Sequence, residues 1–396
     1  MSNISITPRT MQAISNVGGN VATYWIMPSG SSWTDFTDIY NSAHDGDVIV
    51  LPNETIIQPT WFWIDKPITI MGDPRGSSVL KVTGQITDPT YGGGTGHQFG
   101  IGKYTETTVP NISGIRFTGF TIEHDRIAAP DMRVAALDIA YAGDNVEIDH
   151  MTFRGITSDV IDIRPWDGTG NADRGTGGPF HDGICNNISI HNNLVDEWWE
   201  GFVDLHQHYL NHVHVFDNVG TATTQHSGFQ GPMALEVNIE QQFGWCKDVV
   251  FANNHFTLSG AAQGGTFTIG AVVNSSEAGQ SGFASPSSND VTYYDVVFAN
   301  NILDGFATGI YLADIHLSLS TPLPTTKTNI IAYQNQILNT GLSLYIWPDS
   351  SEPSWRTASP NDSILLFQNN WGGGSATIDF SRLTGGDPYL LNVGNV

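Results

Sequence analysis

A short motif recurs along this chain, in which an apolar strand ends in a polar residue, most often asparagine. The segments NVEIDHMTF, NISIHNNLV, HVHVFDNVG, DVVFANNHF, DVVFANNIL, NIIAYQNQI and SILLFQNNW align on the apolar anchors Ile148, Ile190, Val215, Phe251, Phe298, Tyr333 and Phe367. The intervals between anchors are unequal, while the strand pattern stays constant. This combination is typical of a solenoid whose loops expand outward, because a propeller blade would instead repeat four antiparallel strands.

The repeat predicts an all-β chain, folded as a single-stranded right-handed parallel β-helix of about ten coils. We expect an N-terminal segment at 1–45, the β-helix at 46–380 and a C-terminal tail at 381–396. Within the first segment, apolar residues at helical spacing follow Ser31 and Ser32, which predicts a helix that caps the first coil: Trp33, Phe36, Ile39, Tyr40 and Ala43. Stretches rich in Gly, Pro, Ser or Thr are expected to be loops, namely 83–110, 166–186, 271–290 and 316–328.

A polar residue stands two positions after each anchor. These residues predict an inward ladder of side chains that hydrogen-bond from coil to coil: His150, Asn192, Asp217, Asn253, Asn300, Asn335 and Asn369. We interpret this ladder as structural, since it would satisfy buried backbone groups at a turn.

A second strand with strict alternation follows each anchor. Its apolar pairs are Leu137/Ile139, Ile161/Ile163, Val203/Leu205, Leu235/Val237, Phe267/Ile269, Ile310/Leu312 and Leu344/Ile346. The residues between the pairs should face outward and be exposed: Asp138, Asp162, Asp204, Glu236, Thr268, Tyr311 and Tyr345. Neighbouring strands lie about 4.8 Å apart, so four carboxylates should stand in a row on consecutive coils. Such a row repels itself unless a cation or shared protons intervene, which points to metal binding or acid–base chemistry rather than a plain solvated face.

Charge limits the partners of this protein. The formal net charge of −24 disfavours nucleic acid and anionic membranes, and a uronate-containing polymer would need a bridging cation, for which calcium with its preference for oxygen ligands is suited. A neutral sugar is the alternative.

The two cysteines, Cys185 and Cys246, should lie one intervening coil apart, too far for a disulfide, so we predict two free thiols. No signal peptide or membrane span is visible, and the expected location is extracellular, either secreted or carried on a virion.

Two short segments of the chain resemble a known family. NVEIDHMTF followed by EGFVD is similar to the calcium-binding core of the pectate lyase family, in which a W-I-D-H-type strand precedes a D/E-G-x-x-D strand. The resemblance implies that Asp149, Glu200 and Asp204 are calcium ligands and that the chain is a calcium-assisted polysaccharide lyase. The chain departs from the family beyond this core, because no Lys or Arg stands between Arg174 and Lys247 and the arginine base of the family has no counterpart there.

Histidines are concentrated in that gap: His181, His191, His206, His208, His212, His214 and His226. We therefore nominate Arg164 and His206 for charge neutralisation and proton transfer in a β-elimination. The structural alternative is that each pairs with a nearby carboxylate. A zinc site at His206, His208, His212 and His214 is a weaker alternative, because the two pairs fall on different strands.

The same row suits a glycoside hydrolase. One carboxylic acid would protonate the leaving oxygen and another would activate water, with Asp162, Asp204 and Glu236 available on neighbouring or alternate coils. The chain lacks the paired-Asp and G-H-G signatures of the β-helix hydrolases that resemble polygalacturonases.

The other residues expected to bind substrate are Asp138, Asn238, His208, Tyr311 and Trp347, the aromatic ones by stacking on sugar rings. A third hypothesis is a virion tailspike or surface protein that holds glycan, as a monomer or homotrimer. The polysaccharide is the partner expected in all three.

Overall fold

The computed structural model describes residues 10–12, 22–86, 96–102, 112–130, 132–139, 143–163, 184–206, 208–224, 231–238, 244–265, 268–274, 291–312, 325–346, 356–357, 363–378, 383–384 and 389–396. Within these residues the strands form three long sheets, which we call sheets A, B and C, with 14, nine and ten strands. A short strand pair, β31 (Arg356–Thr357) and β34 (Leu383–Thr384), lies apart from them.

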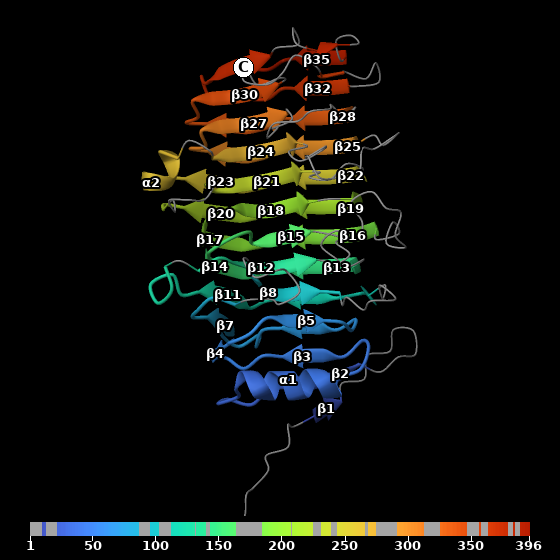
Figure 1. Cartoon of the computed structure of the whole chain (residues 1–396), viewed down its shortest axis with the longest axis vertical. Helices are drawn as coiled ribbons and strands as arrows, with labels where there is room; N and C mark the ends of the chain where they lie inside the picture. Colours follow the sequence, from blue (N-terminus) through green and yellow to red (C-terminus); the bar gives the residue numbers. More distant parts are fainter. Residues whose placement is uncertain are drawn as a thin grey trace, which may run out of the picture.

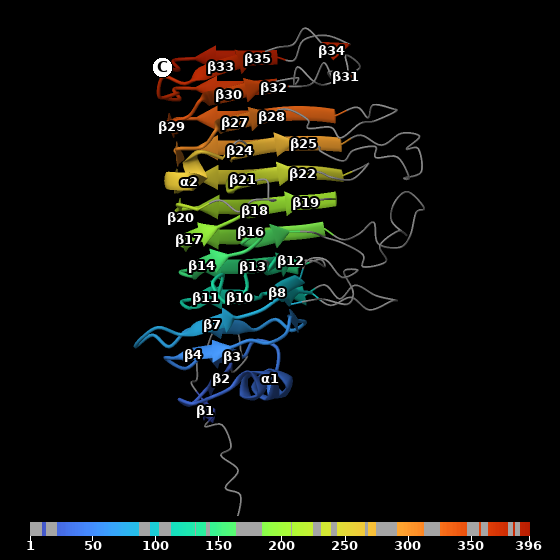
Figure 2. The ribbon, with the colours of Figure 1, turned by 60° about the vertical axis from the view of Figure 1, so that its left-hand side comes forward.

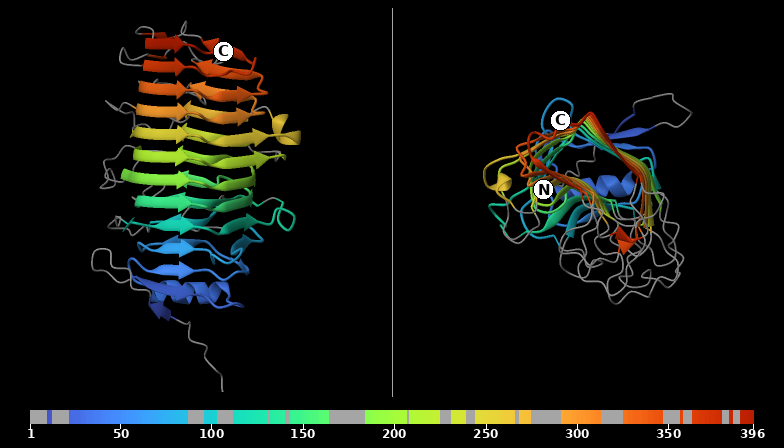
Figure 3. Two further views of the ribbon diagram at one scale, coloured as in Figure 1. Left: turned by 180° about the vertical axis from the view of Figure 1, so that it is seen from behind. Right: turned by 90° about the horizontal axis from the view of Figure 1, so that it is seen from above.

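Each coil of the chain passes through sheets A, B and C in turn and then returns to sheet A one level higher. Strands therefore pair with their counterparts in the next coil and run parallel to them, apart from the antiparallel pair β1 and β2. The coils stack from the N-terminal to the C-terminal end of the molecule, and they superimpose when viewed along the stack (Figures 1 and 3). This arrangement is a right-handed parallel β-helix, as the sequence predicts.

The strands of sheet A are, in stacking order, β1 (Thr10–Gln12), β2 (Thr23–Ile26), β3 (Val48–Val50), β6 (Thr69–Met71), β10 (Arg116–Thr118), β13 (Gly143–Asp149), β16 (Ile184–His191), β19 (His208–Phe216), β22 (Gly244–Ala252), β25 (Val291–Ala299), β28 (Thr325–Tyr333), β32 (Ser363–Phe367) and β35 (Tyr389–Val393), with β9 (Ile112–Ser113) beside β13. Sheet B stacks β4 (Thr55–Ile57), β7 (Val79–Val82), β11 (Thr121–His124), β14 (Thr152–Ile156), β17 (Leu194–Trp198), β20 (Val219–Ala222), β23 (His255–Leu258), β26 (Ile302–Asp304) and β29 (Gln336–Leu338).

Sheet C stacks β5 (Phe62–Ile64), β8 (Gly96–Ile101), β12 (Val134–Ile139), β15 (Ile161–Ile163), β18 (Gly201–His206), β21 (Met233–Asn238), β24 (Ile269–Asn274), β27 (Thr308–Leu312), β30 (Leu342–Ile346) and β33 (Ser375–Ile378). Four strands overlap stretches that we expected to be loops, namely β16 and β28 of sheet A and β8 and β24 of sheet C. In β8 the sequence GHQFGI hides a strand, because two glycines mask the alternation of the buried Phe99 and Ile101.

Helix α1 (Trp33–Ser42) covers the N-terminal end of the stack, as predicted (Figure 2). Ser32 is the N-cap: its Oγ accepts a hydrogen bond from the Asp35 N–H, and the Asp35 carboxylate accepts one from the Ser32 N–H. Phe36 and Ile39 are buried against the first coils. A second short helix, α2 (Gly260–Gln263), lies at the edge of sheet B after β23.

The β-helix extends beyond the boundaries that we expected at both ends. Strand β2 pairs with β3 inside the predicted N-terminal segment, and β35 pairs with β32 inside the predicted tail. Within the expected C-terminal tail, residues 389–393 thus form a strand of a further coil.

A ladder of buried asparagines joins sheets A and B. Its members are Asn193, Asn218, Asn254, Asn301, Asn335, Asn369 and the partly buried Asn395, one for each of the last seven coils. The Nδ2 of each asparagine donates a hydrogen bond of 2.8–3.0 Å to the Oδ1 of the asparagine in the next coil. The same Oδ1 also accepts a hydrogen bond from the backbone N–H of the first asparagine. The second Nδ2 proton goes to a backbone carbonyl, such as Phe251 for Asn301. The ladder thus satisfies polar groups that the turn buries.

The ladder confirms the kind of structure predicted but corrects its register. Only Asn335 and Asn369 of the predicted column belong to it. Four predicted residues stand one place too early, namely Asn192, Asp217, Asn253 and Asn300, and the fifth, His150, precedes Met151, whose backbone N–H donates to the first ladder residue Asn193. All five adopt a left-handed backbone, with φ between 53° and 57°. The anchors Tyr333 and Phe367 are likewise displaced by one, because Phe298 pairs with Ala332.

Cys185 and Cys246 are buried and are not joined in a disulfide, as predicted. Both lie in the same column of sheet A, where Leu210 stands between them.

We predict that Asn301→Ala destabilises the protein by roughly 3–5 kcal/mol, because it leaves both buried donors of Asn254 without their acceptor and removes one of the two donors to the Asn335 Oδ1. Urea denaturation followed by circular dichroism measures the change. The neighbouring Asn300→Gly is the control: the side chain is exposed and the backbone φ is 56°, so glycine should shift stability by less than about 1 kcal/mol. Equal losses in both variants would contradict the ladder.

Candidate functional site: an acidic column on sheet C

Four carboxylates stand at one register position of sheet C. Asp138 in β12 pairs with Asp162 in β15, Asp162 pairs with Asp204 in β18, and Asp204 pairs with Glu236 in β21. Each alternates with buried apolar neighbours, as Asp162 does with Ile161 and Ile163, so all four leave the sheet on the side away from the core. We call these four residues the acidic column. This geometry confirms the predicted row, with about 4.8 Å between successive strands.

The acidic column is buried, contrary to the exposed strand face expected from the alternation. Asp138, Asp162, Asp204 and Glu236 retain only 3%, 2%, 3% and 5% of their accessible surface. Interactions between charges are stronger in such a place than in bulk water, because fewer water molecules screen them.

A histidine and a tryptophan adjoin the start of the column. His97 of β8 is buried, and its Nδ1 lies 3.3 Å from the Asp138 carboxylate. The indole of Trp63, in β5, meets the His97 ring edge-on with 4.9 Å between the ring centroids. Sequence reasoning missed both, since β8 lies within a stretch that we expected to be a loop. The signal that could have found them is the match between FWI in β5 and FGI in β8.

A fifth carboxylate, Asp159, borders the column. Its Oδ1 accepts a hydrogen bond of 2.8 Å from the Gly201 N–H. A Cβ atom on Gly201 would lie 3.0 Å from that oxygen and 3.2 Å from the Asp204 Cβ, so a side chain here would push the two aspartates apart by a few tenths of an ångström. Asp159 precedes the alternating part of its strand, and for this reason the alternation did not single it out.

Glu200 lies directly before this glycine and does not reach the column as a free ligand. Arg133 Nη2 lies 2.6 Å from its Oε1, and the Ser158 hydroxyl donates to its Oε2. Burial raises the pKa of Glu200 to about 7, the Asp159 carboxylate adds to the rise, and Arg133 opposes it. Glu200 is thus a titrating group behind the column.

The column continues toward the C-terminal end with apolar and aromatic residues. Val272 follows Glu236, and Tyr311 and Tyr345 follow on the next two strands. The expectation that Thr268 follows Glu236 is therefore wrong: Thr268 is buried before the start of β24, and Ala271 and Val273 form the inward pair of that strand. The predicted Tyr311 and Tyr345 positions are correct, and their rings stack with 5.0 Å between centroids.

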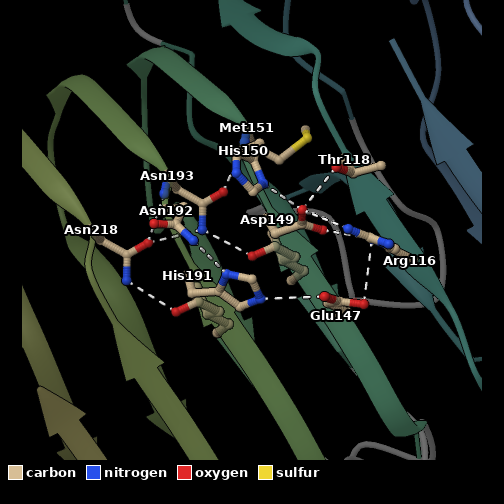
Figure 4. Close-up of polar contacts among 12 residues, drawn as sticks. Arg116, Thr118, Glu147, Asp149, His150, Met151, His191, Asn192, Asn193 and Asn218 are labelled. Carbon is tan, nitrogen blue, oxygen red and sulfur yellow. Dashed lines mark hydrogen bonds and ion pairs between the residues drawn. The ribbon is translucent and has the colours of Figure 1, made fainter. Parts of the chain in front are cut away.

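The structure does not bring the three expected calcium ligands together. Asp149 belongs to β13 of sheet A, whereas Asp204 belongs to sheet C. The Asp149 carboxylate accepts two hydrogen bonds from Arg116, at 2.7 and 2.8 Å, and further bonds from Thr118 and His150 (Figure 4). Burial alone would raise the pKa of Asp149, but these bonds, that of Arg116 foremost, lower it to about 2.

These observations contradict the ligand set carried over from the pectate lyase family, because Asp149 is an ion-pair partner on another sheet and Glu200 is engaged by Arg133. Among the residues that the structure describes, no three His, Cys, Asp or Glu side chains are arranged to hold a metal ion. These three residues therefore do not form a calcium site, and the reaction proposed below does not involve calcium at them.

The remaining predicted residues are placed only in part. Arg164 and Trp347 lie outside the described residues. His206 and Asn238 pair with each other in sheet C. They stand two residues after Asp204 and Glu236, respectively, and the structure does not describe their side chains. His208 begins β19 and so belongs to sheet A rather than to the sheet of the acidic column.

No protein-family model matches this chain, and no curated protein matches its sequence. Among solved structures, the chain resembles the catalytic unit of a thermostable GH87 alpha-1,3-glucanase from Streptomyces thermodiastaticus, with a TM-score of 0.42, 12% identity and coverage of 93% of this chain and 69% of that chain. It also resembles a family 28 exopolygalacturonase from Yersinia enterocolitica, with a TM-score of 0.37, 11% identity and coverage of 92% and 75%. At these values the likeness concerns the general fold and carries nothing about the reaction. No helix in the described part of the chain is long and apolar enough to span a bilayer.

We predict that Glu200→Gln changes how stability depends on pH. The raised pKa of Glu200 means that the folded protein holds a proton that the unfolded chain releases above about pH 4.5, so the wild type loses stability as pH rises from about 4.5 to 7. The variant lacks this loss and should gain up to about 3 kcal/mol relative to the wild type between pH 5 and pH 8. Urea midpoints at both pH values test this, with the exposed Asp38→Asn as control. Parallel pH profiles for Glu200→Gln and the wild type would contradict it.

Proposed function

We propose that this protein cleaves a polysaccharide by hydrolysis in the acidic column. The observation that supports the proposal is the register of Asp162, Asp204 and Glu236, which places three buried carboxylates on consecutive strands of one sheet. Glycoside hydrolysis needs two carboxyl groups on either side of a glycosidic bond, one to protonate the leaving oxygen and one to attack the sugar or to activate water.

The spacing of the strands offers both arrangements that hydrolases use. Asp162 and Asp204 lie on adjacent strands about 4.8 Å apart, close to the separation of about 5–5.5 Å in retaining enzymes. Asp162 and Glu236 lie two strands apart, near the upper end of the range of about 6.5–9.5 Å in inverting enzymes. The configuration of the released sugar therefore reports which pair carries out the reaction.

The proposal changes the preference drawn from sequence, which was a calcium-assisted lyase acting on a uronate-containing glycan. That preference depended on Asp149, Glu200 and Asp204 as one ligand set, and these residues do not meet. β-Elimination with Arg164 and His206 remains the alternative, and calcium dependence belongs to it. Secretion or carriage on a virion, and a monomeric or trimeric state, stay predictions.

We predict that Asp204→Asn lowers kcat by about 10²–10⁴-fold, because the amide can neither donate nor accept the proton that the reaction transfers. Hydrolysis of a panel of neutral and uronate-containing polysaccharides, followed by the release of reducing ends, gives the wild-type activity to compare. Asp196→Asn is the matched control, since Asp196 lies on the same coil but on sheet B. Wild-type kcat in Asp204→Asn would contradict the proposed site.

We predict further that the products are saturated sugars and that a calcium chelator leaves the rate unchanged. Hydrolysis adds water across the bond, whereas elimination leaves a double bond conjugated to a carboxylate that absorbs ultraviolet light. Proton magnetic resonance of fresh product identifies the anomer and so the reacting pair. Unsaturated products together with calcium dependence would favour the lyase, and glycan binding without any product would favour a surface glycan-binding protein.

A further inference from the structure

Two neighbouring columns of outward side chains on sheet A are apolar. They belong to the six strands at the C-terminal end of that sheet, from β19 to β35 (Figure 1). The first column consists of Val250, Val297, Ile331, Leu365 and Leu391. The second column consists of Phe216, Ala252, Ala299, Tyr333, Phe367 and Val393. We call these two columns the apolar face.

The apolar face is open to the surroundings. Its residues alternate along each strand with core residues, as Val297 stands between the buried Val296 and Phe298. No residue of the face is buried, and Tyr333 and Val393 retain 38% and 49% of their accessible surface. Single exposed apolar side chains are common on proteins, but a contiguous array over six strands is typical of an interaction surface.

Charge distinguishes the apolar face from the part of sheet A below it. In the same two columns, His214 precedes Val250 and His191 precedes Phe216, and the ion pairs of Arg116 lie further toward the N-terminal end (Figure 4). No charged side chain belongs to the apolar face, although the protein carries 39 acidic residues. Removing charges from water on association is costly, so this face can be covered at less cost than the charged part of the sheet.

Polar turn residues border the apolar face on both sides. Asp248 and Asp295 stand two positions before the first column, and we call them the acidic rim. The residues that directly follow the second column form the amide rim, namely Asn253, Asn300, Gln334 and Gln368. All of these rim residues have a left-handed backbone at the end of their strand pattern. An apolar centre with a polar rim is the usual anatomy of a protein–protein interface.

We infer that the apolar face joins two copies of this chain face to face in a twofold dimer. Side chains on successive strands form rows that repeat every 4.8 Å or so, and rows interdigitate along the whole face only with a surface of the same repeat. A second copy supplies that surface. The inference does not depend on the proposed reaction, because the acidic column belongs to sheet C. The dimer differs from the monomer or homotrimer expected from the sequence.

The two rims select the orientation of the copies. A twofold axis parallel to the stack of coils brings the acidic rim of one copy opposite the amide rim of the other, with Asp295 at the level of Asn300. Amide groups can then donate hydrogen bonds to carboxylates across the interface. An axis parallel to the strands would instead bring the two acidic rims together, and like charges repel. Both N-terminal ends therefore point the same way.

The size of the face is close to what a dimer needs. Five strand intervals and five residue steps from rim to rim, with the outer strands included, give a projected area of about 16 by 29 Å, or roughly 450 Å² on each copy. Protruding side chains add to this area, so two copies bury about 1,000 Å², the lower end for a specific interface. We therefore expect dissociation constants of about micromolar size.

Sedimentation equilibrium of the full chain tests the inference at concentrations from about 1 to 100 µM. We expect a monomer–dimer equilibrium that added salt strengthens, because salt screens the repulsion between two chains of net charge −24. Ile331→Asp and Leu365→Asp should each raise the dissociation constant by at least about a hundredfold, since each buries a charge in the interface. Ile302→Asp is the matched control, because Ile302 is partly exposed on sheet B.

The rims are tested separately by charge at one exposed position. Gln334→Glu should weaken the dimer by about tenfold and Gln334→Lys should strengthen it, because the acidic rim of the other copy lies opposite. Hydroxyl-radical footprinting of the wild type keeps the test independent of how well the variants fold. At 100 µM or so Tyr333 and Phe367 should be protected relative to about 1 µM, and the exposed Leu194 of sheet B should be unchanged.

Several outcomes would overturn the dimer: a monomeric wild type over the whole range, a trimer, unchanged association in folded Ile331→Asp or Leu365→Asp, equal dissociation in Ile302→Asp, or unprotected Tyr333. Stronger association in Gln334→Glu than in Gln334→Lys would overturn the orientation. Circular dichroism establishes which variants are folded, and the footprint of the wild type decides the matter if neither variant of the face folds.

Discussion

In-register stacking of parallel strands is the constraint on which the rest of this protein depends. Strands of successive coils pair directly, residue for residue, and the buried asparagine ladder repeats the same hydrogen bonds at each coil from Asn193 to Asn395. A shift of one residue would turn every core side chain of a strand to the opposite face. Such a shift would also separate each asparagine Oδ1 from the two N–H groups that donate hydrogen bonds to it. The apolar core and the ladder therefore enforce one register together.

The acidic column is a direct consequence of that register. Asp162 and Glu236 are far apart in the chain, yet they stand two strands apart because each coil returns to sheet C at the same register position. Loops can then differ in length without disturbing the column. The same register puts Trp63 and Tyr345 in line with the carboxylates.

Two glycines determine how closely the Trp63 indole and the Asp159 carboxylate approach the acidic column. Gly100 admits the Trp63 indole above the sheet, and Gly201 lets the Asp159 carboxylate approach Asp204. A side chain at either place would occupy space that the functional groups now fill. On sheet A, outward polar residues are also engaged with one another, as the bonds from Arg116 to Asp149 show.

The sequence by itself determined the solenoid, its capping helix, the free cysteines and the row from Asp138 to Glu236, because periodic alternation and repetition are local patterns that translate directly into stacked strands. Only the tertiary structure decided the rest. The ladder lies one residue later than predicted in most coils because a left-handed residue precedes it, and backbone conformation at a turn is not visible in an alignment of anchors. Asp149 and Asp204 belong to different sheets, a separation that motif spacing does not reveal. His97 and Trp63 meet Asp138 through β8, whose glycines concealed the strand. These outcomes depend on contacts between distant coils, which form only when the whole stack is assembled.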